Sequence, residues 1–263
     1  METDVAQLLI RTETGDGYRY FLARRTRDGY WEWIGGKEEE GETIEETAER
    51  ELKEEIQIDW NEHNFEIRGL ADSYPSEADS SYLLNPVLIE VDEKTFGEIS
   101  ESDLSNEHDQ LEWIELAEFG EFETLGQYRA LERLDLIEGY VALAVLENDG
   151  EYLLVQRSEE NTSSGEWGFV SGKMEEDENP EEAAKRELWE ETRVDAEPLE
   201  TGDFYIGKGE LGYWRLFPVL METDETEVEL NWELSDYKWV NLEELEDMKT
   251  MERMKAVEKL ELV

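Results

Sequence analysis

The sequence contains no cysteine and no long hydrophobic run, and it is poor in basic residues. Without a cysteine among 263 residues, disulfide bonds and thiolate chemistry are excluded. No stretch is long and apolar enough to span a membrane, and the N-terminus lacks the basic-then-apolar pattern of a signal sequence. We therefore expect a cytoplasmic protein with no membrane partner.

Basic residues are scarce: 24 Lys and Arg stand against 72 Asp and Glu, for a net charge of −48. Such a surface repels itself, and molar salt removes most of that cost by shortening the screening length to about 3 Å. We infer, as a hypothesis, a salt-rich host cytoplasm. The composition resembles that of halophilic archaeal proteins, although Glu predominates over Asp. The same field would repel phosphate chains, so no polynucleotide partner is expected.

A 23-residue pattern occurs twice, from Gly36 to Ile58 and from Gly172 to Val194. Each copy has a glycine, a glutamate six residues later, and then an Arg-Glu-Leu-x-Glu-Glu run. A hairpin pattern precedes each copy, and the aromatic content of 11% favours folded domains over disorder. Because the repeats also agree outside the pattern, we predict two domains, residues 1–137 and 138–263, joined by a short linker.

The pattern predicts a helix in each copy. Thr43 opens the first helix with a capping box, and Asn179 followed by Pro180 opens the second. From these caps we expect helices over residues 44–56 and 180–192. Two further helical stretches are expected near the domain ends, at residues 125–136 and 242–260.

Three glutamates in each copy recur at i, i+3 and i+4, so their carboxylates share one helix face. The two trios are Glu51, Glu54 and Glu55, and Glu187, Glu190 and Glu191. For either helix alone, a solvated acidic face is the competing interpretation; the surrounding pattern, repeated at the same place, argues against it. Three carboxylates on one face repel each other, and a hard cation such as Mg²⁺ or Mn²⁺ would relieve that repulsion. Arg50 and Arg186 precede the trios and are expected to hold the first glutamate by a charge-assisted hydrogen bond.

The repeated pattern resembles the signature of the Nudix hydrolases, G-x5-E-x7-R-E-U-x-E-E-x-G-U, where U is aliphatic. It departs at the second glycine, which is Gln57 in one copy and Arg193 in the other, and Ile34 and Val170 stand where the family commonly has proline. The resemblance implies an α/β (α+β) class: two tandem Nudix-type α/β/α sandwich domains, each a mixed sheet between helices. We expect the two to form a pseudo-dimer within one chain.

The resemblance also implies an enzyme. It would be a metal-dependent pyrophosphohydrolase that cleaves a nucleoside diphosphate linked to another moiety by water attack on phosphorus, with Mg²⁺ or Mn²⁺ as cofactor. The implied metal ligands are the two trios and the backbone carbonyls of Gly35 and Ser171. The implied catalytic residues are Arg50, Glu51 and Glu107 in the first repeat, and Arg186, Glu187 and Glu233 in the second. Whether the first glutamate of the trio or the downstream glutamate is the general base stays open, and Glu42 and Glu178 are expected to brace the loop.

The substrate is left open among small nucleotides: a nucleoside triphosphate, a nucleotide sugar such as ADP-ribose, or a dinucleoside polyphosphate. Tyr74 lies where dinucleoside polyphosphate hydrolases tend to carry tyrosine, but for a single tyrosine a core or rim aromatic is the favoured interpretation. No basic cluster for a further phosphate group stands out in the sequence. Two alternatives remain, a catalytic domain paired with a regulatory one, and a non-catalytic nucleotide-binding module.

Overall fold

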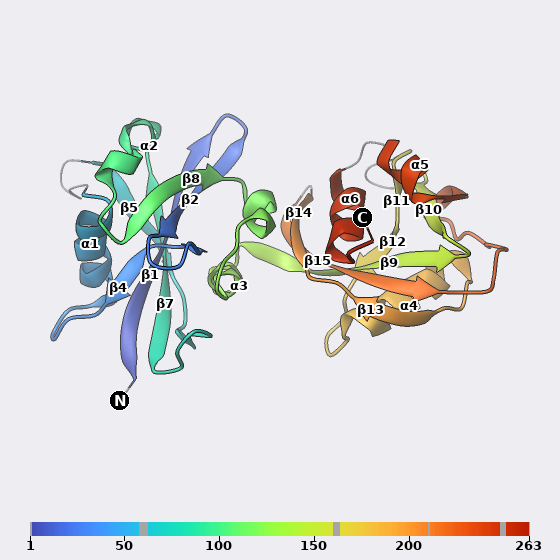
Figure 1. Ribbon diagram of the computed structural model, residues 1–263, viewed down its shortest axis with the longest axis horizontal. Coiled ribbons are helices and arrows are strands. Elements are labelled where there is room, and N and C mark those ends of the chain that lie inside the picture. Colours follow the sequence, from blue (N-terminus) through green and yellow to red (C-terminus); the bar gives the residue numbers. More distant parts are fainter. Residues whose placement is uncertain (1, 58–62, 160–163, 210, 248–250, 263) are drawn as a thin grey trace. The chain divides into compact units, whose positions relative to one another are not determined.

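The computed structural model divides the chain into two compact units, unit 1 (Met1–Ile137) and unit 2 (Glu138–Val263), each holding one copy of the repeated pattern (Figure 1). The residues that it describes are 2–57, 63–159, 164–209, 211–247 and 251–262. Ile58, which closes the first copy of the pattern, lies outside them.

Unit 1 is built on a mixed sheet with the strand order β3-β2-β1-β7-β5. Strands β1 and β7 run parallel, while β2, β4 and β8 pair antiparallel with their neighbours. The strands are β1 (Thr3–Thr14), β2 (Gly17–Arg25), β3 (Trp31–Glu32), β4 (Gly35–Lys37), β5 (Phe65–Leu70), β6 (Tyr74–Pro75), β7 (Tyr82–Val91) and β8 (His108–Ile114). The helices are α1 (Ile44–Glu55), α2 (Glu93–Glu98) and α3 (Tyr128–Arg133), with 3₁₀ turns η1 (Glu101–Asp103) and η2 (Leu116–Glu121).

Unit 2 repeats this topology, with the strand order β11-β10-β9-β15-β13. Its strands are β9 (Ile137–Asn148), β10 (Glu151–Arg157), β11 (Trp167–Gly168), β12 (Val170–Lys173), β13 (Glu197–Thr201), β14 (Tyr205–Gly209), β15 (Gly212–Glu222) and β16 (Leu234–Val240). Its helices are α4 (Pro180–Thr192), α5 (Leu242–Asp247) and α6 (Met251–Lys259). Every strand of unit 1 therefore has a counterpart in unit 2.

Both faces of the unit 2 sheet are buried, which is why its central strands read as nearly continuous apolar runs. Along β9, Ala142 and Ala144 pack in one cluster with Leu188 of α4, whereas Val145 packs in a second cluster with Val257 of α6. The alternation follows from the period of two in a strand. The predicted sandwich of a mixed sheet between helices is thereby confirmed.

The helix that carries the trio begins and ends as the sequence predicts. Thr43 and Asn179 form the N-caps, and each takes part in a capping box. Gln57 and Arg193, where the signature has glycine, both adopt a left-handed backbone with φ of 52° and 58°. A side chain there costs about 1–2 kcal/mol relative to glycine, so the departure affects stability and leaves the turn unchanged.

The helix at the end of unit 1 is shorter than predicted. Instead of residues 125–136, α3 covers only Tyr128–Arg133, because Gly126 before it and Asp135 after it have left-handed φ of 63° and 52°. A right-handed helix cannot continue through such residues. In unit 2 the predicted stretch contains α5 and α6, and residues 248–250 between them lie outside the described ranges.

Tyr74 is a core residue. Only 2% of it is exposed, and its hydroxyl donates a 2.7 Å hydrogen bond to Oε1 of Gln7. Its counterpart is Tyr205, since Tyr205 pairs with Leu216 in the way that Tyr74 pairs with Leu84. The tyrosine is therefore common to both repeats and serves packing in each.

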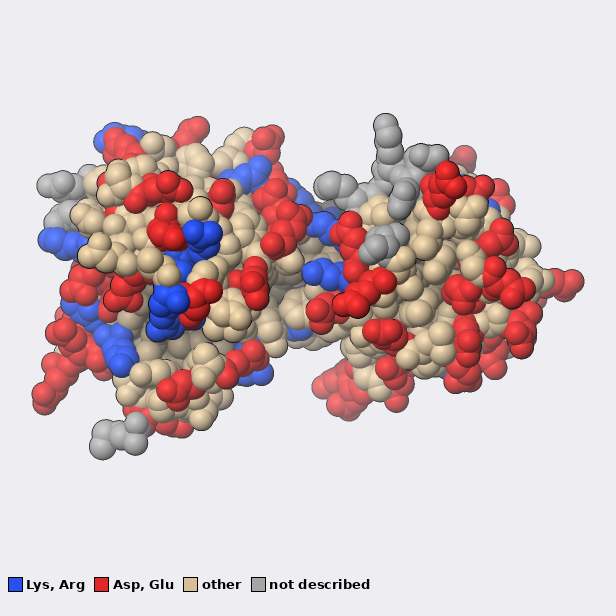
Figure 2. All heavy atoms as spheres, viewed as in Figure 1, with Lys and Arg blue, Asp and Glu red and all other residues tan. Residues whose placement is uncertain are grey.

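Acidic side chains cover the visible face of both units (Figure 2). In the part of the chain that the structure describes, no helix combines the length and the apolar composition needed to cross a membrane. A net charge of −48 makes the acidic side chains of the chain repel one another. Screening by salt is the simplest way to reduce the resulting repulsion.

We predict that the free energy of unfolding rises with KCl concentration and levels off near about 1 M, where the screening length has fallen to about 3 Å. Denaturation by urea, followed by circular dichroism at a series of KCl concentrations, measures this. NaCl is the control for a screening effect and should act alike. A stability that does not change with salt would contradict the interpretation of the acidic surface.

Candidate active site

Each unit places the first glutamate of its trio directly against the glycine that opens the pattern. A Cβ atom added to Gly36 would lie 2.0 Å from Oε1 of Glu51, and one added to Gly172 would lie 1.8 Å from the carboxyl carbon of Glu187. Only glycine leaves room for a carboxylate at that position. The glycine therefore forms a cradle for a partly desolvated carboxylate, which explains its place in the pattern.

An arginine fixes this carboxylate and ties the loop to the helix. Arg50 donates hydrogen bonds to Glu51 (2.6 Å), to Glu42 (2.9 Å) and to the carbonyl oxygen of Lys37 (2.7 Å). The hydrogen bond from Arg50, joined by the backbone N–H of Glu39, lowers the pKa of Glu42 to about 2. Glu42 thus braces the arginine, as the sequence led us to expect.

The same arrangement recurs in unit 2. Arg186 donates to Glu187 (2.6 Å), to Glu178 (2.7 Å) and to the carbonyl oxygen of Lys173 (3.0 Å). Arg186 lowers the pKa of Glu178 to about 2 through its hydrogen bond. Each of the two units therefore builds the same network at the same place in its own fold, which a chance charge run would not do.

The trio of unit 1 lines a cleft of about 950 Å³. Glu51 and Glu55 are buried, whereas 58% of the Glu54 side chain is exposed. Burial raises the pKa of Glu51, because it penalises the charged carboxylate more than Arg50 compensates. Gly35 and Glu107, both predicted site residues, line the same cleft.

A downstream loop carries the last predicted glutamate to the end of the trio helix. The N–H of Ser105 donates to the carbonyl oxygen of Glu55 (2.6 Å), and the N–H of Glu107 donates to the Ser105 hydroxyl (3.2 Å). In unit 2 Asn231 takes the role of Ser105, since its N–H donates to the carbonyl oxygen of Glu191 (2.9 Å). The N–H of Glu233 in turn donates to Asn231 Oδ1 (2.9 Å).

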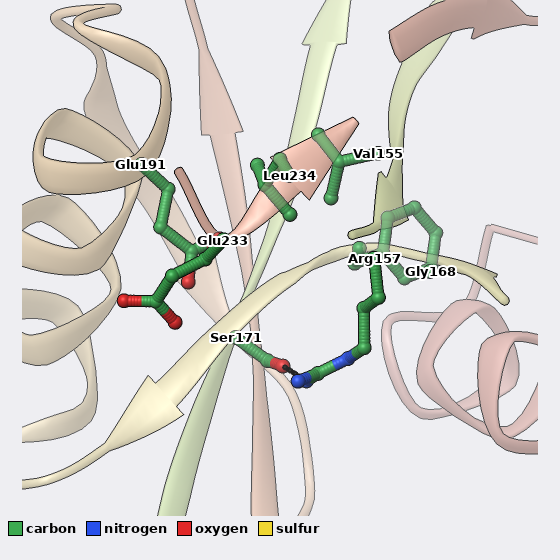
Figure 3. A pocket seen from close by; sticks show the side chains of 8 residues that line it. Val155, Arg157, Gly168, Ser171, Glu191, Glu233 and Leu234 are labelled. Atoms are coloured by element: carbon green, nitrogen blue, oxygen red, sulfur yellow. Dashed lines mark hydrogen bonds between the residues drawn. The ribbon is translucent and has the colours of Figure 1, made fainter. Parts of the chain in front are cut away.

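Three predicted site residues of unit 2, Ser171, Glu191 and Glu233, line a small cavity of about 20 Å³, large enough for about one water molecule. Arg157 lines it too, and its guanidinium donates to the hydroxyl of Ser171 at 3.4 Å (Figure 3). Burial raises the pKa of Glu191 to about 8, and the neighbouring charges of Glu187 and Glu233 act in the same direction. Glu190 is the exposed member of this trio, at 55%.

Within the described ranges, no three acidic or histidine side chains stand close enough to enclose a metal ion. The buried carboxylates nevertheless fit a hard divalent cation. The two cradled carboxylates lie against backbone, and in the described part of the chain the Glu191 carboxylate has no hydrogen bond or ion pair. Oxygen donors of this kind suit Mg²⁺ or Mn²⁺.

Sequence reasoning missed an arginine that reaches the site in both units. Arg25 ends β2 and Arg157 ends β10, and in each unit the strand pairing shifts by a bulge just before the arginine. A bulge of this kind redirects a side chain and is common beside active sites. The signal was available, because the two arginines occupy matching positions in the aligned hairpins.

His108, which directly follows Glu107, was also missed. Its Nε2 lies 3.1 Å from Oε1 of Glu32, and its Nδ1 lies 2.9 Å from Oε2 of Glu55. The contact of Nδ1 with Glu55 is an ion pair rather than a well-aligned hydrogen bond. Burial acts to lower the pKa of His108, but the two carboxylates outweigh it and raise the pKa to about 9. Burial acts to raise the pKa of Glu55, but His108 and Ser105 together outweigh burial, so the pKa of Glu55 is lowered.

A lysine lies over an aromatic ring beside each signature loop. Lys37 stands 4.9 Å from the ring centre of Tyr82, and Lys173 stands 4.5 Å from that of Trp214. The cleft of unit 1 also brings Arg25 and Arg27, which are neighbours in the sequence, together with Lys37 and Arg50. The fold thus places basic side chains among the glutamates that line the cleft.

Comparisons with known proteins agree with this geometry. A sequence model of the NUDIX domain matches residues 3–134 and again 138–260. A CTP pyrophosphohydrolase from Escherichia coli (strain K12) is 43% identical over 56 residues, which span 21% of this chain and 42% of that protein. The chain thus covers less than half of that relative's length.

Solved structures give similar matches. A MutT protein from Methanosarcina mazei Go1 is 29% identical over 43% of this chain and 86% of its own, with a TM-score of 0.38. An Ap4A hydrolase binary complex from C. elegans is 21% identical over 50% of this chain and 86% of its own, with a TM-score of 0.37. The two family-model matches together span nearly the whole sequence. The chain therefore belongs to the Nudix family, with two domains of that family in tandem.

Proposed function

We propose that the protein is a metal-dependent pyrophosphohydrolase of small nucleotides, with an active site in each unit. The observation that carries this proposal is the network built twice: a carboxylate cradled by glycine and held by arginine beside two further glutamates. A non-catalytic binding module would not need every carboxylate of the trio in both copies. Intact trios in both units favour two working sites over one.

The metal ligands would be Glu51, Glu54, Glu55 and the carbonyl of Gly35 in unit 1, and Glu187, Glu190, Glu191 and the carbonyl of Ser171 in unit 2. Bound Mg²⁺ or Mn²⁺ would neutralise diphosphate charge and make a water molecule nucleophilic. Arg50 and Arg186 orient the first carboxylate of each trio. The general base would be either that carboxylate or the downstream residue, Glu107 or Glu233, which the loop holds near the helix end.

The substrate would bind through its phosphates and its base. A cleft of about 950 Å³ has the size of a small-molecule site, and its basic residues suit phosphate oxygens. Tyr82 in unit 1 and Trp214 in unit 2 offer a ring on which a base could stack, next to a lysine. Candidate substrates are nucleoside triphosphates, nucleotide sugars such as ADP-ribose, and dinucleoside polyphosphates; the match to a CTP pyrophosphohydrolase adds CTP to the panel.

We predict that Glu54→Gln and Glu190→Gln each remove roughly half of the metal-dependent cleavage, while the double variant loses it by at least about a hundred-fold, because each change disables one metal site. Release of phosphorylated products from the panel, in molar KCl with saturating Mg²⁺ or Mn²⁺, measures this. Both residues are exposed, so the variants should fold normally.

Glu49→Gln is a matched control, because Glu49 lies exposed on the same helix outside the trio. If one single change abolishes all cleavage, the other domain has a binding or regulatory role instead. If the folded wild type cleaves nothing on the panel, or the double variant cleaves as fast as the wild type, the proposed function is wrong.

We predict that Glu191→Gln changes how stability depends on pH. The pKa of Glu191 is raised from 4.5 to about 8 in the folded chain, so the folded state holds its proton more tightly than the unfolded state does. With a chelator present, the free energy of unfolding of the wild type should therefore decrease as pH rises from about 4.5 through about 8. In the variant, residue 191 is neutral at every pH. The variant should therefore lack this pH-dependent loss of stability and be more stable than the wild type above pH 8.

Chemical denaturation across this pH range measures the effect, with Glu190→Gln as the control because Glu190 is largely exposed. The charged groups that face Glu191 are Glu187, Glu190, Glu233 and Arg157, and they are unchanged in Glu191→Gln. Added Mn²⁺ should stabilise the wild type more than this variant. Parallel pH profiles of the wild type and Glu191→Gln would show that this carboxylate is not the uncompensated group that the structure indicates.

A further inference from the structure

The two active sites differ at the last glutamate of the trio. In unit 1, His108 lies between Glu55 and Glu32, and only 4% of its side chain is exposed. Both ring nitrogens face carboxylate oxygens, at 2.9 Å and 3.1 Å. The Nε2 atom hydrogen-bonds Glu32, and Nδ1 lies against the Glu55 carboxylate. Unit 1 therefore holds an imidazole ring directly against one of its proposed metal ligands.

Unit 2 has no such imidazole at the corresponding place, which the structure describes as leucine. Leu234 pairs with Arg157 as His108 pairs with Arg25, so leucine replaces the histidine at the same register. Gly168 pairs with Val155 on the neighbouring strand, as Glu32 pairs with Ala23. Both partners of the unit 1 ion pair are thus absent from unit 2.

The consequence falls on Glu191, the counterpart of Glu55. Within the described residues its carboxylate makes no hydrogen bond or ion pair, and it faces the acidic side chains of Glu187 and Glu233. The basic group that acts on Glu191 is Arg157, and its guanidinium donates to the Ser171 hydroxyl at 3.4 Å (Figure 3). A divalent cation would relieve a repulsion in unit 2 that His108 already relieves in unit 1.

We propose that His108 and Glu32 weaken divalent-metal binding in unit 1, so that unit 2 holds the high-affinity metal site of the chain. This inference rests on the proposed function. A metal that binds Glu55 must displace His108 from it, whereas within the described residues no side chain pairs with the Glu191 carboxylate. At limiting metal only unit 2 is loaded, and unit 1 becomes active as the concentration of divalent cation rises. His108 acts here as a positioning residue.

Direct binding of Mn²⁺ to the full chain tests this, with the free ion measured by electron paramagnetic resonance in molar KCl. Glu187→Gln/Glu190→Gln leaves only the site of unit 1, and Glu51→Gln/Glu54→Gln leaves only that of unit 2. The quadruple variant gives the background from surface carboxylates. We expect unit 2 to bind Mn²⁺ about ten-fold to a hundred-fold more tightly than unit 1, the range by which groups adjoining ligands alter metal affinity.

Exchange of the differing residues then assigns the cause. With only unit 1 intact, His108→Leu should raise its Mn²⁺ affinity by about ten-fold. His63→Leu is the matched control, because it removes the other histidine, which pairs with Glu98 and not with the trio. With only unit 2 intact, Gly168→Glu/Leu234→His should lower the affinity; a side chain fits at Gly168, where an added Cβ meets nothing within 4 Å.

The exchange in unit 2 keeps the test valid even if His108→Leu fails to fold, and thermal melts by circular dichroism establish folding for each variant. Equal Mn²⁺ affinities in the two units, or an affinity that does not respond to the exchange, would overturn the inference while leaving the proposed function intact. If the quadruple variant binds as much Mn²⁺ as the wild type, the metal sites themselves are misassigned and the proposed function fails with them.

Discussion

Repulsion among carboxylates crowded at one end of a helix is the constraint on which each unit of this protein is organised. The first carboxylate is partly desolvated, and it is tolerated because a glycine leaves room for it and an arginine pairs with it. That arginine is itself held by the glutamate six residues after the glycine. The repeated pattern therefore contains a glycine, a glutamate and an arginine that together form one device, a hydrogen-bonded arrangement that stabilises a buried negative charge.

The two units complete that device differently. Unit 1 compensates Glu55 with His108, which a second carboxylate, Glu32, holds in place. Unit 2 has leucine and glycine at those positions and leaves Glu191 with a pKa raised by burial to about 8. Because the backbone register around the two sites is the same, the difference lies in side-chain chemistry alone. Similar signatures thus support unequal electrostatics, which a match to the signature by itself could not reveal.

Features set by local interactions were predictable from the sequence, and features set by strand pairing were not. The caps at Thr43 and Asn179 depend on residues within one turn, so the trio helix was located to within about one residue. The helix before residue 137 was predicted too long, since the left-handed conformation of Asp135 has no clear signal in the sequence. His108 meets Glu32 and Glu55 only through the pairing of β2 with β8 and β3, and separations of 76 and 53 residues conceal such contacts.

A chain with a net charge of −48 attracts cations over its entire surface, so charge alone cannot define a metal site in it. Burial can define such a site. Salt at about 1 M screens exposed carboxylates beyond about 3 Å, but partly buried groups are screened much less. Glu51, Glu55 and Glu191 are all buried, whereas most of the acidic surface is not. The salt that would relieve repulsion across the surface would therefore also increase the contrast between these sites and the surrounding glutamates. Acidic surface and specific metal binding are compatible because they respond differently to the same ions.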